Sequence, residues 1–158
     1  MEIGQAFQGF SNLPIIFERD KTYKNEEPIS DFLLNDWSEV IVSQRVYQML
    51  KEKYSDEMDF YECFARDEGE LKPYYIVRAK KLLDVLDRQN SVIGGILGTA
   101  IKSVLVDNIP ETENFFYVYQ GAPRVMSKKL YDDLKAMNPT NFEVTPIATT
   151  SEELQSFL

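Results

Sequence analysis

The sequence contains no histidine. Histidine is the general base of Ser-His-Asp and Cys-His hydrolases, and it supplies ligands to many zinc sites. Its absence excludes those mechanisms and those metal sites. A single cysteine, Cys63, likewise excludes a disulfide within the chain and a cysteine-cluster metal site. We interpret Cys63 as a small buried apolar residue, because a nucleophilic thiolate needs a base or a cation beside it.

Long apolar runs are also missing. The longest, from Val92 to Ile101, is too short to span a bilayer. The opening residues Met1 to Gly4 lack the basic and apolar regions of a secretory signal. We therefore expect a cytoplasmic chain without a membrane partner.

Basic residues are in the minority, with 17 of them against 26 acidic residues and a net charge of −9. A field of this sign repels nucleic acid and favours basic proteins as partners. We therefore expect no nucleic-acid binding, and a basic protein is the partner that the charge favours.

The remaining composition is that of a globular protein, with 158 residues of which 44% are hydrophobic and 13% aromatic. We expect a single α+β domain over residues 1–158 with a mainly antiparallel sheet. Within it we distinguish an N-terminal segment (1–29), a central region (30–147) and an acidic tail (148–158). No cofactor is expected.

A short pattern occurs twice, at Ile41 to Lys51 and again at Val125 to Lys135. Each copy has two apolar residues, a serine and then an amphipathic helical pattern with Tyr, Leu and Lys at matching positions. Ser43 and Ser127 stand where an N-cap accepts a hydrogen bond from the first helical turn. The pattern predicts two similar units of strand, serine cap, helix and strand, which scaffold the fold.

Local patterns predict the other elements. The two repeats are expected to close with strands at 58–65 and 141–147. Residues 78–87 fit either a continued strand or a helix. Further strands are predicted at 14–17, 73–77, 103–106 and 114–120, and a short helix with Ser30 as its cap at 30–34.

Acidic residues are concentrated between Asp56 and Glu70, where Arg66 alone opposes them. Two interpretations are open for this segment: a solvated edge strand with its loop, or a partner-binding patch. Trp37 is similarly open between packing at the core or rim and a binding hot spot. The residues we predict to bind a partner are Asp56, Glu57, Asp59, Glu62, Asp67, Glu68, Glu70 and Trp37.

Paired carboxylates raise a second hypothesis, a carboxylate-dependent enzyme. The candidate pairs are Asp84 with Asp87, and Asp59 with Glu62. Turn chemistry closed by Ser91 is the simpler interpretation of the first pair.

The segment Gly94–Thr99 raises a third hypothesis, a module that self-associates through residues 94–101. No lysine follows Gly98, so the spacing of a phosphate-binding loop fails. We interpret the segment as an apolar turn or short helix, and as a contact surface if it is exposed. The chain is expected to be a monomer or a weak homodimer.

The order of Ser43, Asp84, Asp87, Ser91 and Ser127, with the two apolar–Ser helix openings around them, resembles a known family. That family comprises the predicted immunity proteins of bacterial polymorphic-toxin systems, formerly a family of unknown function typified by a myxobacterial protein. The resemblance extends from Ser30 to Ile147. It implies a small cytoplasmic protein that binds a cognate toxin, with no catalytic residue. Together with the acidic surface, it favours a basic toxin such as a nuclease.

Overall fold

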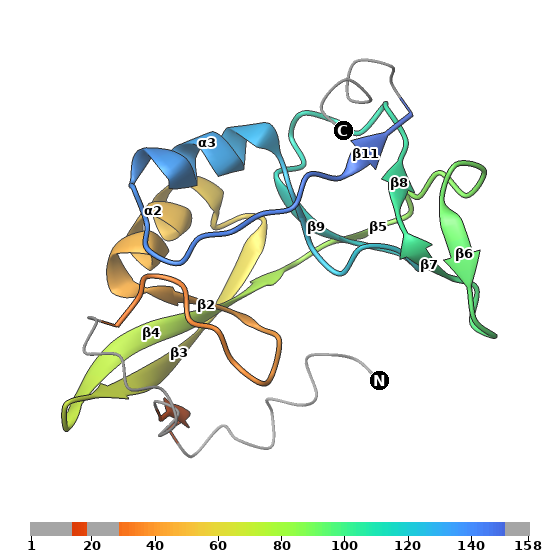
Figure 1. Ribbon diagram of the computed structural model, residues 1–158. Helices are drawn as coiled ribbons and strands as arrows, with labels where there is room; N and C mark the ends of the chain where they lie inside the picture. Colours follow the sequence, from red (N-terminus) through yellow and green to blue (C-terminus); the bar gives the residue numbers. More distant parts are fainter. Residues whose placement is uncertain (1–13, 19–28, 151–158) are drawn as a thin grey trace. The chain divides into compact units, whose positions relative to one another are not determined.

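The computed structural model describes residues 14–18 and 29–150 (Figure 1). This part of the chain contains two helices and several short strands in mixed sheets, so the predicted α+β class is confirmed. Neither helix is long and apolar enough to cross a membrane. The strands are β1 (Ile16–Phe17), β2 (Val40–Ser43), β3 (Met58–Asp67), β4 (Glu70–Ala79), β5 (Leu82–Leu83), β6 (Val92–Gly94), β7 (Thr99–Lys102), β8 (Val104–Leu105), β9 (Phe115–Val118), β10 (Val125–Met126) and β11 (Ala148–Thr149), and the helices are α2 (Gln44–Tyr54) and α3 (Lys128–Ala136).

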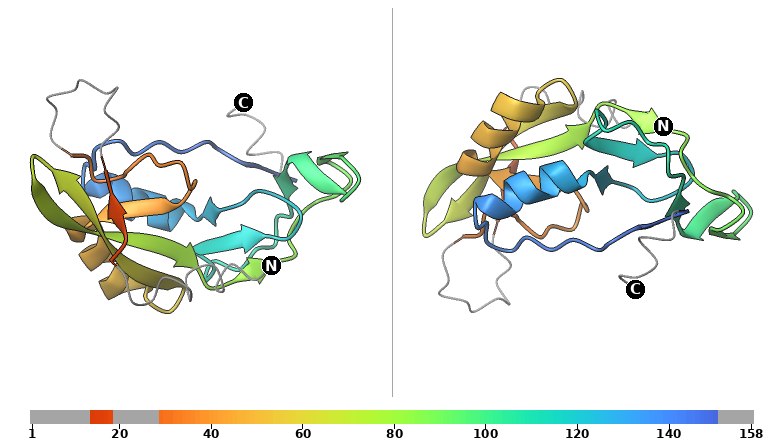
Figure 2. Two further views of the ribbon diagram at one scale, coloured as in Figure 1. Left: turned by 90° about the horizontal axis from the view of Figure 1, so that it is seen from below. Right: turned by 90° about the horizontal axis from the view of Figure 1, so that it is seen from above.

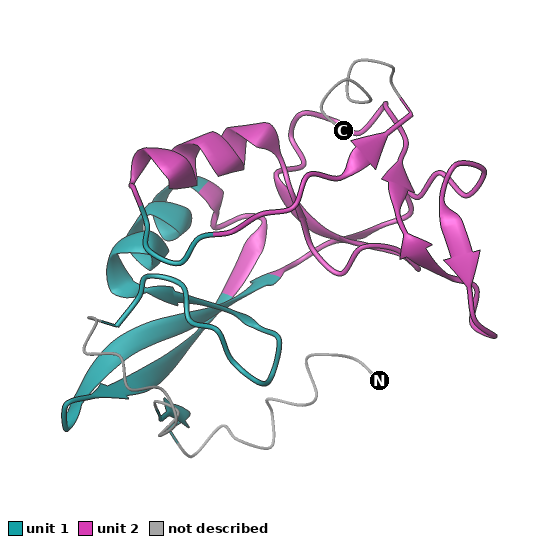
Figure 3. Ribbon diagram, in the orientation of Figure 1, with its two compact units in different colours: residues 1–53, 60–78, 139–142 teal, residues 54–59, 79–138, 143–158 magenta. Residues whose placement is uncertain are grey.

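The chain groups into two compact units (Figure 3). Unit 1 comprises residues 1–53, 60–78 and 139–142, and unit 2 comprises residues 54–59, 79–138 and 143–158. Each unit thus includes one short segment that lies far away in the sequence from most of its other residues. The predicted acidic tail is described only as far as residue 150.

Unit 1 is built on a four-stranded sheet in the order β1-β3-β4-β2. β3 and β4 are joined by the two-residue turn Glu68-Gly69, in which both residues have positive φ (51° and 85°). This is the backbone of a type I′ hairpin turn, which matches the twist of the two strands. β2 pairs antiparallel with β4, and β1 pairs parallel with β3.

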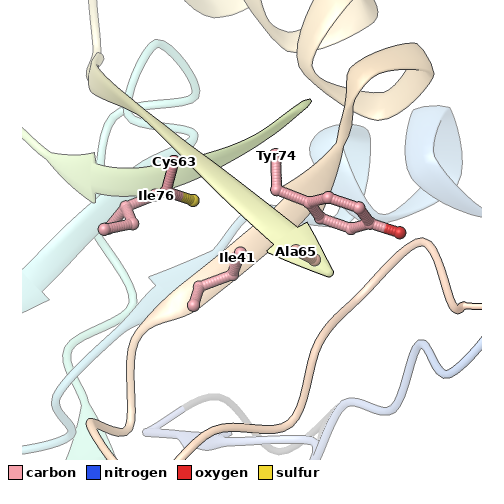
Figure 4. Close-up of a cluster of buried hydrophobic side chains, with 5 residues drawn as sticks. All are labelled: Ile41, Cys63, Ala65, Tyr74 and Ile76. Atoms are coloured by element: carbon pink, nitrogen blue, oxygen red, sulfur yellow. The ribbon is translucent and has the colours of Figure 1, made fainter. Parts of the chain in front are cut away.

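Both faces of this sheet are covered. On one face, Ile41, Cys63, Ala65, Tyr74 and Ile76 form a buried cluster drawn from β2, β3 and β4 (Figure 4). Helix α2 lies along the other face (Figure 2), with its apolar stripe of Val46 and Leu50 buried as the sequence predicts. Tyr47 of the helix stacks on Tyr75 at 3.6 Å between ring centroids.

The described part of unit 2 contains three small sheets, with strand orders β10-β9-β5, β11-β8 and β6-β7. Its core cluster consists of Leu86, Leu105, Phe116 and Val118. Helix α3 buries Leu130 and Leu134, two of the residues that the second repeat places on its inner face. The aromatic run predicted as a strand at 114–120 forms β9, where three of the four side chains are buried.

The helix predicted at 30–34 is wrong. Phe32 instead makes an antiparallel bridge to Val42. The Asp31 carbonyl accepts from the Ser43 N–H at 2.7 Å, and the Asp31 N–H donates to the Thr140 hydroxyl at 2.8 Å. Backbone groups engaged by distant residues in this way are not available for a local helical turn.

The strand predicted at 141–147 is also wrong. Residues 142–147 pair with no strand in the described part of the chain, and the only strand nearby is the two-residue β11, which is parallel to β8. Pro146 lacks an N–H for a ladder. Asn141 is held by the hydrogen bond from its side-chain amide to the Phe32 carbonyl. The repeat is therefore confirmed as strand, serine and helix, without a second closing strand.

Candidate functional site

The predicted acidic residues at the β3–β4 turn differ in how they are held. The Asp67 side chain is only 10% exposed and accepts a hydrogen bond from the Lys72 ammonium at 2.7 Å. This bond raises the pKa of Lys72. Glu68 and Glu70 are exposed. The turn thus presents two exposed carboxylates, with Asp67 acting as an internal brace.

Two further acids lie on β3. Glu62 and Asp59 are both exposed, and Asp59 is 3.9 Å from the Lys80 ammonium. An exposed pair at that distance contributes little to stability. Both carboxylates are therefore accessible to a partner.

The last two acids follow α2 in a turn. Asp56 is exposed, whereas Glu57 accepts from the backbone N–H of Asn114 at 2.6 Å and from its side-chain amide at 3.0 Å. Glu57 is therefore engaged inside unit 2. Asp56, Glu57 and Asp59 belong to unit 2 and the other four acids to unit 1, so all seven do not gather within either unit.

Trp37 stands on a braced loop between Leu33 and Val40. The Asn35 side chain donates to the carbonyls of Leu33 and Glu39 and accepts from the N–H groups of Trp37 and Glu39. Trp37 remains 52% exposed, although its ring meets that of Phe17 edge-on at 5.3 Å. Trp37 thus packs in part against Phe17, and its role as a binding hot spot stays a prediction.

Two residues of this loop were not singled out by the sequence analysis. Leu34 is 95% exposed beside Trp37, and Asn35 holds the loop in shape. The local signal for such a turn is Asn35 itself, two residues before Trp37, because Asn side chains readily bond the backbone N–H two residues on.

Residues 92–102 form the β6–β7 hairpin. Gly95 and Gly98 in its turn both have positive φ, which glycine adopts without strain. Its large apolar side chains, Val92, Ile93, Ile96, Leu97 and Ile101, are all exposed. We predicted a contact surface here if the segment is exposed, and its large apolar side chains are exposed. The turn of this segment belongs to a β-hairpin.

The pair Asp84 and Asp87 does not have the properties of an acid–base site, and Asp59 and Glu62 are exposed residues that belong to different units. Asp84 is exposed. The Asp87 carboxylate accepts hydrogen bonds from the Asn90 side chain at 2.7 Å and from the backbone N–H groups of Gln89 and Asn90. The bond from the Asn90 side chain is the main cause of the lowered pKa of Asp87. A general acid at neutral pH needs a raised pKa. Ser91 closes this turn by donating its N–H to the Asp87 carbonyl, so the turn interpretation holds.

Cys63 is fully buried, as predicted. Burial and then the charge of Glu62 raise the pKa of its thiol to about 12, so the thiolate is not populated at neutral pH. Over residues 14–18 and 29–150, no three Cys, Asp or Glu side chains are placed to hold a metal ion.

A buried carboxylate missed by the sequence analysis organises unit 1. Asp31 accepts from the Ser43 hydroxyl at 2.6 Å, from the Arg45 guanidinium at 2.6 and 2.8 Å, and from the Thr140 N–H at 3.0 Å. Burial by itself raises the pKa of Asp31, but these hydrogen bonds outweigh it and hold the pKa well below the usual range. The Ser43 hydroxyl thus donates to the Asp31 carboxylate. The cluster of Asp31, Ser43, Arg45 and Thr140 holds residues 139–142 in unit 1.

A second buried polar residue, Asn114, is the centre of a similar hydrogen-bond cluster in unit 2. The Ser127 hydroxyl donates to its side-chain carbonyl at 2.7 Å, and Glu57 accepts from both its N–H groups. Ser127 also accepts from the Leu130 N–H at 3.1 Å, which confirms it as the cap of α3. These bonds hold residue 57 in unit 2.

The chain was compared with known proteins. The model of the Immunity protein family (Imm11) matches residues 2–148. No curated protein and no solved structure matches the chain. Membership of this family indicates a toxin-neutralising immunity function, with a cognate toxin as the partner. Immunity proteins are in general not enzymes. Because the match covers nearly the whole chain, the chain belongs to the Immunity protein family (Imm11).

Proposed function

We propose that this chain neutralises its cognate toxin by stoichiometric binding without catalysis, and that the toxin is a basic protein such as a nuclease. The observation that carries this proposal is the acidic excess, a net charge of −9, much of it on exposed side chains of β3 and its two flanking turns. Exposed carboxylates imitate the phosphate groups that a nuclease binds, and they speed the encounter with a cationic partner.

The seven acids have two roles in this proposal. The exposed carboxylates make the contact with the toxin: Asp56, Asp59, Glu62, Glu68 and Glu70. Glu57 in unit 2 and Asp67 in unit 1 instead hold the local structure of their own units, because Asn114 and Lys72 already engage their carboxylates.

Trp37 is the proposed hot spot of unit 1. A large aromatic side chain on a braced loop loses little conformational entropy when it is buried by a partner. Its ring face also suits an arginine or lysine of a basic toxin. Trp37→Ala is expected to weaken toxin binding about 30-fold, the loss typical of a hot spot.

The test uses the toxin encoded beside this chain's gene, purified as an inactive variant. Replacing Glu62, Glu68 and Glu70 by lysine should slow association at least about tenfold at low salt and flatten its salt dependence. A matched control replaces three exposed acids elsewhere, Asp84, Asp107 and Glu111, by lysine and so makes the same change in net charge. Equal decreases of the association rate in both variants would show that only net charge matters. Unchanged association rates in both variants would contradict a role of these acids in binding.

The absence of catalysis has its own test. Active toxin is titrated with the chain and the residual toxin activity is measured. Binding predicts that activity ends at one equivalent and that toxin released by denaturation has an unaltered mass. Inactivation by a small fraction of an equivalent would contradict the proposal and revive an enzymatic hypothesis.

A further inference from the structure

We infer that the β6–β7 hairpin (Val92–Lys102) is an apolar anchor that inserts into an apolar groove of the same basic toxin. This inference rests on the proposed function and adds to it a second contact element of a different chemistry. Figure 1 shows β6 and β7 as a separate hairpin within unit 2.

The hairpin concentrates exposed apolar surface. Ile96 is fully exposed, Leu97 nearly so, and Ile101 is 78% exposed. Single exposed apolar residues are ordinary on protein surfaces, but a contiguous group marks an interaction site. These side chains are not part of the buried core of unit 2: among the described residues of the hairpin, Ala100 is the one that packs against that core.

The hairpin is built to present Ile101. Ile93 pairs with Ala100 and Val92 with Lys102, so Ile101 is the extra residue of a β-bulge. A bulge redirects side chains at such a position. The redirected side chain lies over Gly94, where an added Cβ would be only 2.3 Å from the Ile101 Cδ1 atom. Glycine at position 94 thus leaves room for an exposed isoleucine.

The base of the hairpin is fixed to the rest of unit 2. The Ala100 N–H donates to the Gln120 carbonyl at 2.8 Å, and the Gln120 side chain accepts from Arg88. An apolar element held in place before binding loses little freedom when a partner covers it.

Charge decides which partner covers the hairpin. Two copies of this chain repel each other, because each carries a net charge of −9, whereas a basic protein is attracted. Residues 93–101 contain no charged side chain, so none would be desolvated in an apolar groove. Lys102 pairs with Val92 at the open end of the hairpin, where it remains at the rim. Acids elsewhere therefore accelerate the encounter, and the hairpin slows dissociation.

The principal experiment measures binding of Ile96→Asp and Leu97→Asp to the purified inactive toxin. Each is expected to weaken the equilibrium constant about 30-fold or more, mainly through faster dissociation. The matched control is Val144→Asp, which adds the same charge at another exposed apolar side chain of unit 2. Because Ile96 is fully exposed, the thermal midpoint of Ile96→Asp should be unchanged.

A second variant leaves the charge alone. Gly94→Ala adds one methyl group that displaces Ile101, and it should weaken binding about threefold to tenfold, less than a hot-spot loss. Wild-type affinity in Gly94→Ala and in both aspartate variants would overturn the anchor.

The remaining outcomes test whether the hairpin binds something other than the toxin, and whether the proposed function itself fails. A wild-type dimer by light scattering that Ile96→Asp disperses would assign the hairpin to a second copy and overturn the inference. Sedimentation with anionic phosphatidylglycerol vesicles, lost in Ile96→Asp, would assign it to a lipid surface with the same consequence. If the wild-type chain does not bind the toxin, the proposed function and the anchor are both contradicted. If the wild-type chain binds and Ile96→Asp, Leu97→Asp and Gly94→Ala all keep wild-type affinity, only the anchor is contradicted.

Discussion

Ser43 in unit 1 and Ser127 in unit 2 each donate two hydrogen bonds to a buried polar residue that precedes them in the chain. The backbone N–H of Ser43 bonds the Asp31 carbonyl at 2.7 Å, and that of Ser127 bonds the Asn114 carbonyl at 2.8 Å. Each hydroxyl then bonds the side-chain oxygen of the same residue. Each copy of the repeat thus has a polar cluster of its own as well as a helix.

The two clusters differ in charge. Asp31 is an ionised carboxylate whose charge is matched by Arg45, whereas Asn114 is a neutral amide that donates to Glu57. A buried charge requires several partners to offset desolvation, and Asp31 has them from three residues. A buried amide requires fewer. The comparison teaches that one backbone plan tolerates either chemistry, provided that the buried oxygen is satisfied.

Asp31→Ala should have the largest effect on this comparison. It leaves the Ser43 hydroxyl and the Thr140 N–H without their acceptor and weakens the attachment of residues 139–142, at a cost of about 3 kcal/mol. Urea unfolding followed by circular dichroism measures the loss. A change below about 1 kcal/mol would show that the cluster is not a stabilising centre.

Glu57→Ala tests the second cluster and is expected to cost about 2 kcal/mol, because two N–H groups of Asn114 lose a charged acceptor. Asp56→Ala is the matched control, one residue away and exposed, and should change the free energy of unfolding by less than about 0.5 kcal/mol. Equal effects of the two substitutions would contradict the distinct roles of these adjacent acids.

The two serines separate capping from cluster formation. Ser127→Ala loses both the bond to Asn114 and the cap of α3, and should cost about 1.5 kcal/mol. Ser43→Ala should cost about 1 kcal/mol, since Arg45 and Thr140 still hold Asp31. Thermal unfolding of both variants measures the difference, and a larger loss at Ser43 would reverse our order.

The smallest effect is a difference in pH dependence. The folded pKa of Asp31 is below its unfolded pKa of about 3.9, so its stabilisation is complete above that pH and is lost as the pH falls below it. Asp31→Asn has no such carboxylate. The gap in unfolding free energy between wild type and Asp31→Asn should therefore narrow between about pH 5 and about pH 2. A constant gap would mean that the charge of Asp31 is not what stabilises unit 1.

Elements set by local pattern were predictable from the sequence. The amphipathic stripes of α2 and α3 and the aromatic strands β4 and β9 all formed where their periodicity placed them. The failures at 30–34 and 141–147 have one common origin. Asp31 bonds Thr140 across 109 residues, and no window of sequence contains both partners.

The candidate site shows the same limit. Glu57 and Asp67 look like their acidic neighbours in the sequence, and only their distant or cross-turn partners distinguish them. Trp37 was singled out because tryptophan is large and stands in polar surroundings, and its role stays a prediction. The exposure of residues 92–101 depends on the absence of a covering element, which composition alone does not reveal.

The position of Cys63 makes it a native reporter of the opening of unit 1. It is the one cysteine in the sequence, and its sulfur is completely buried. A thiol-specific reagent can therefore modify the wild-type chain only when the β3 region opens. Because each modified molecule gains a fixed mass, the rate can be read by mass spectrometry even with another protein bound. The protection that a toxin gives to unit 1 is thus measurable without introducing any label or substitution.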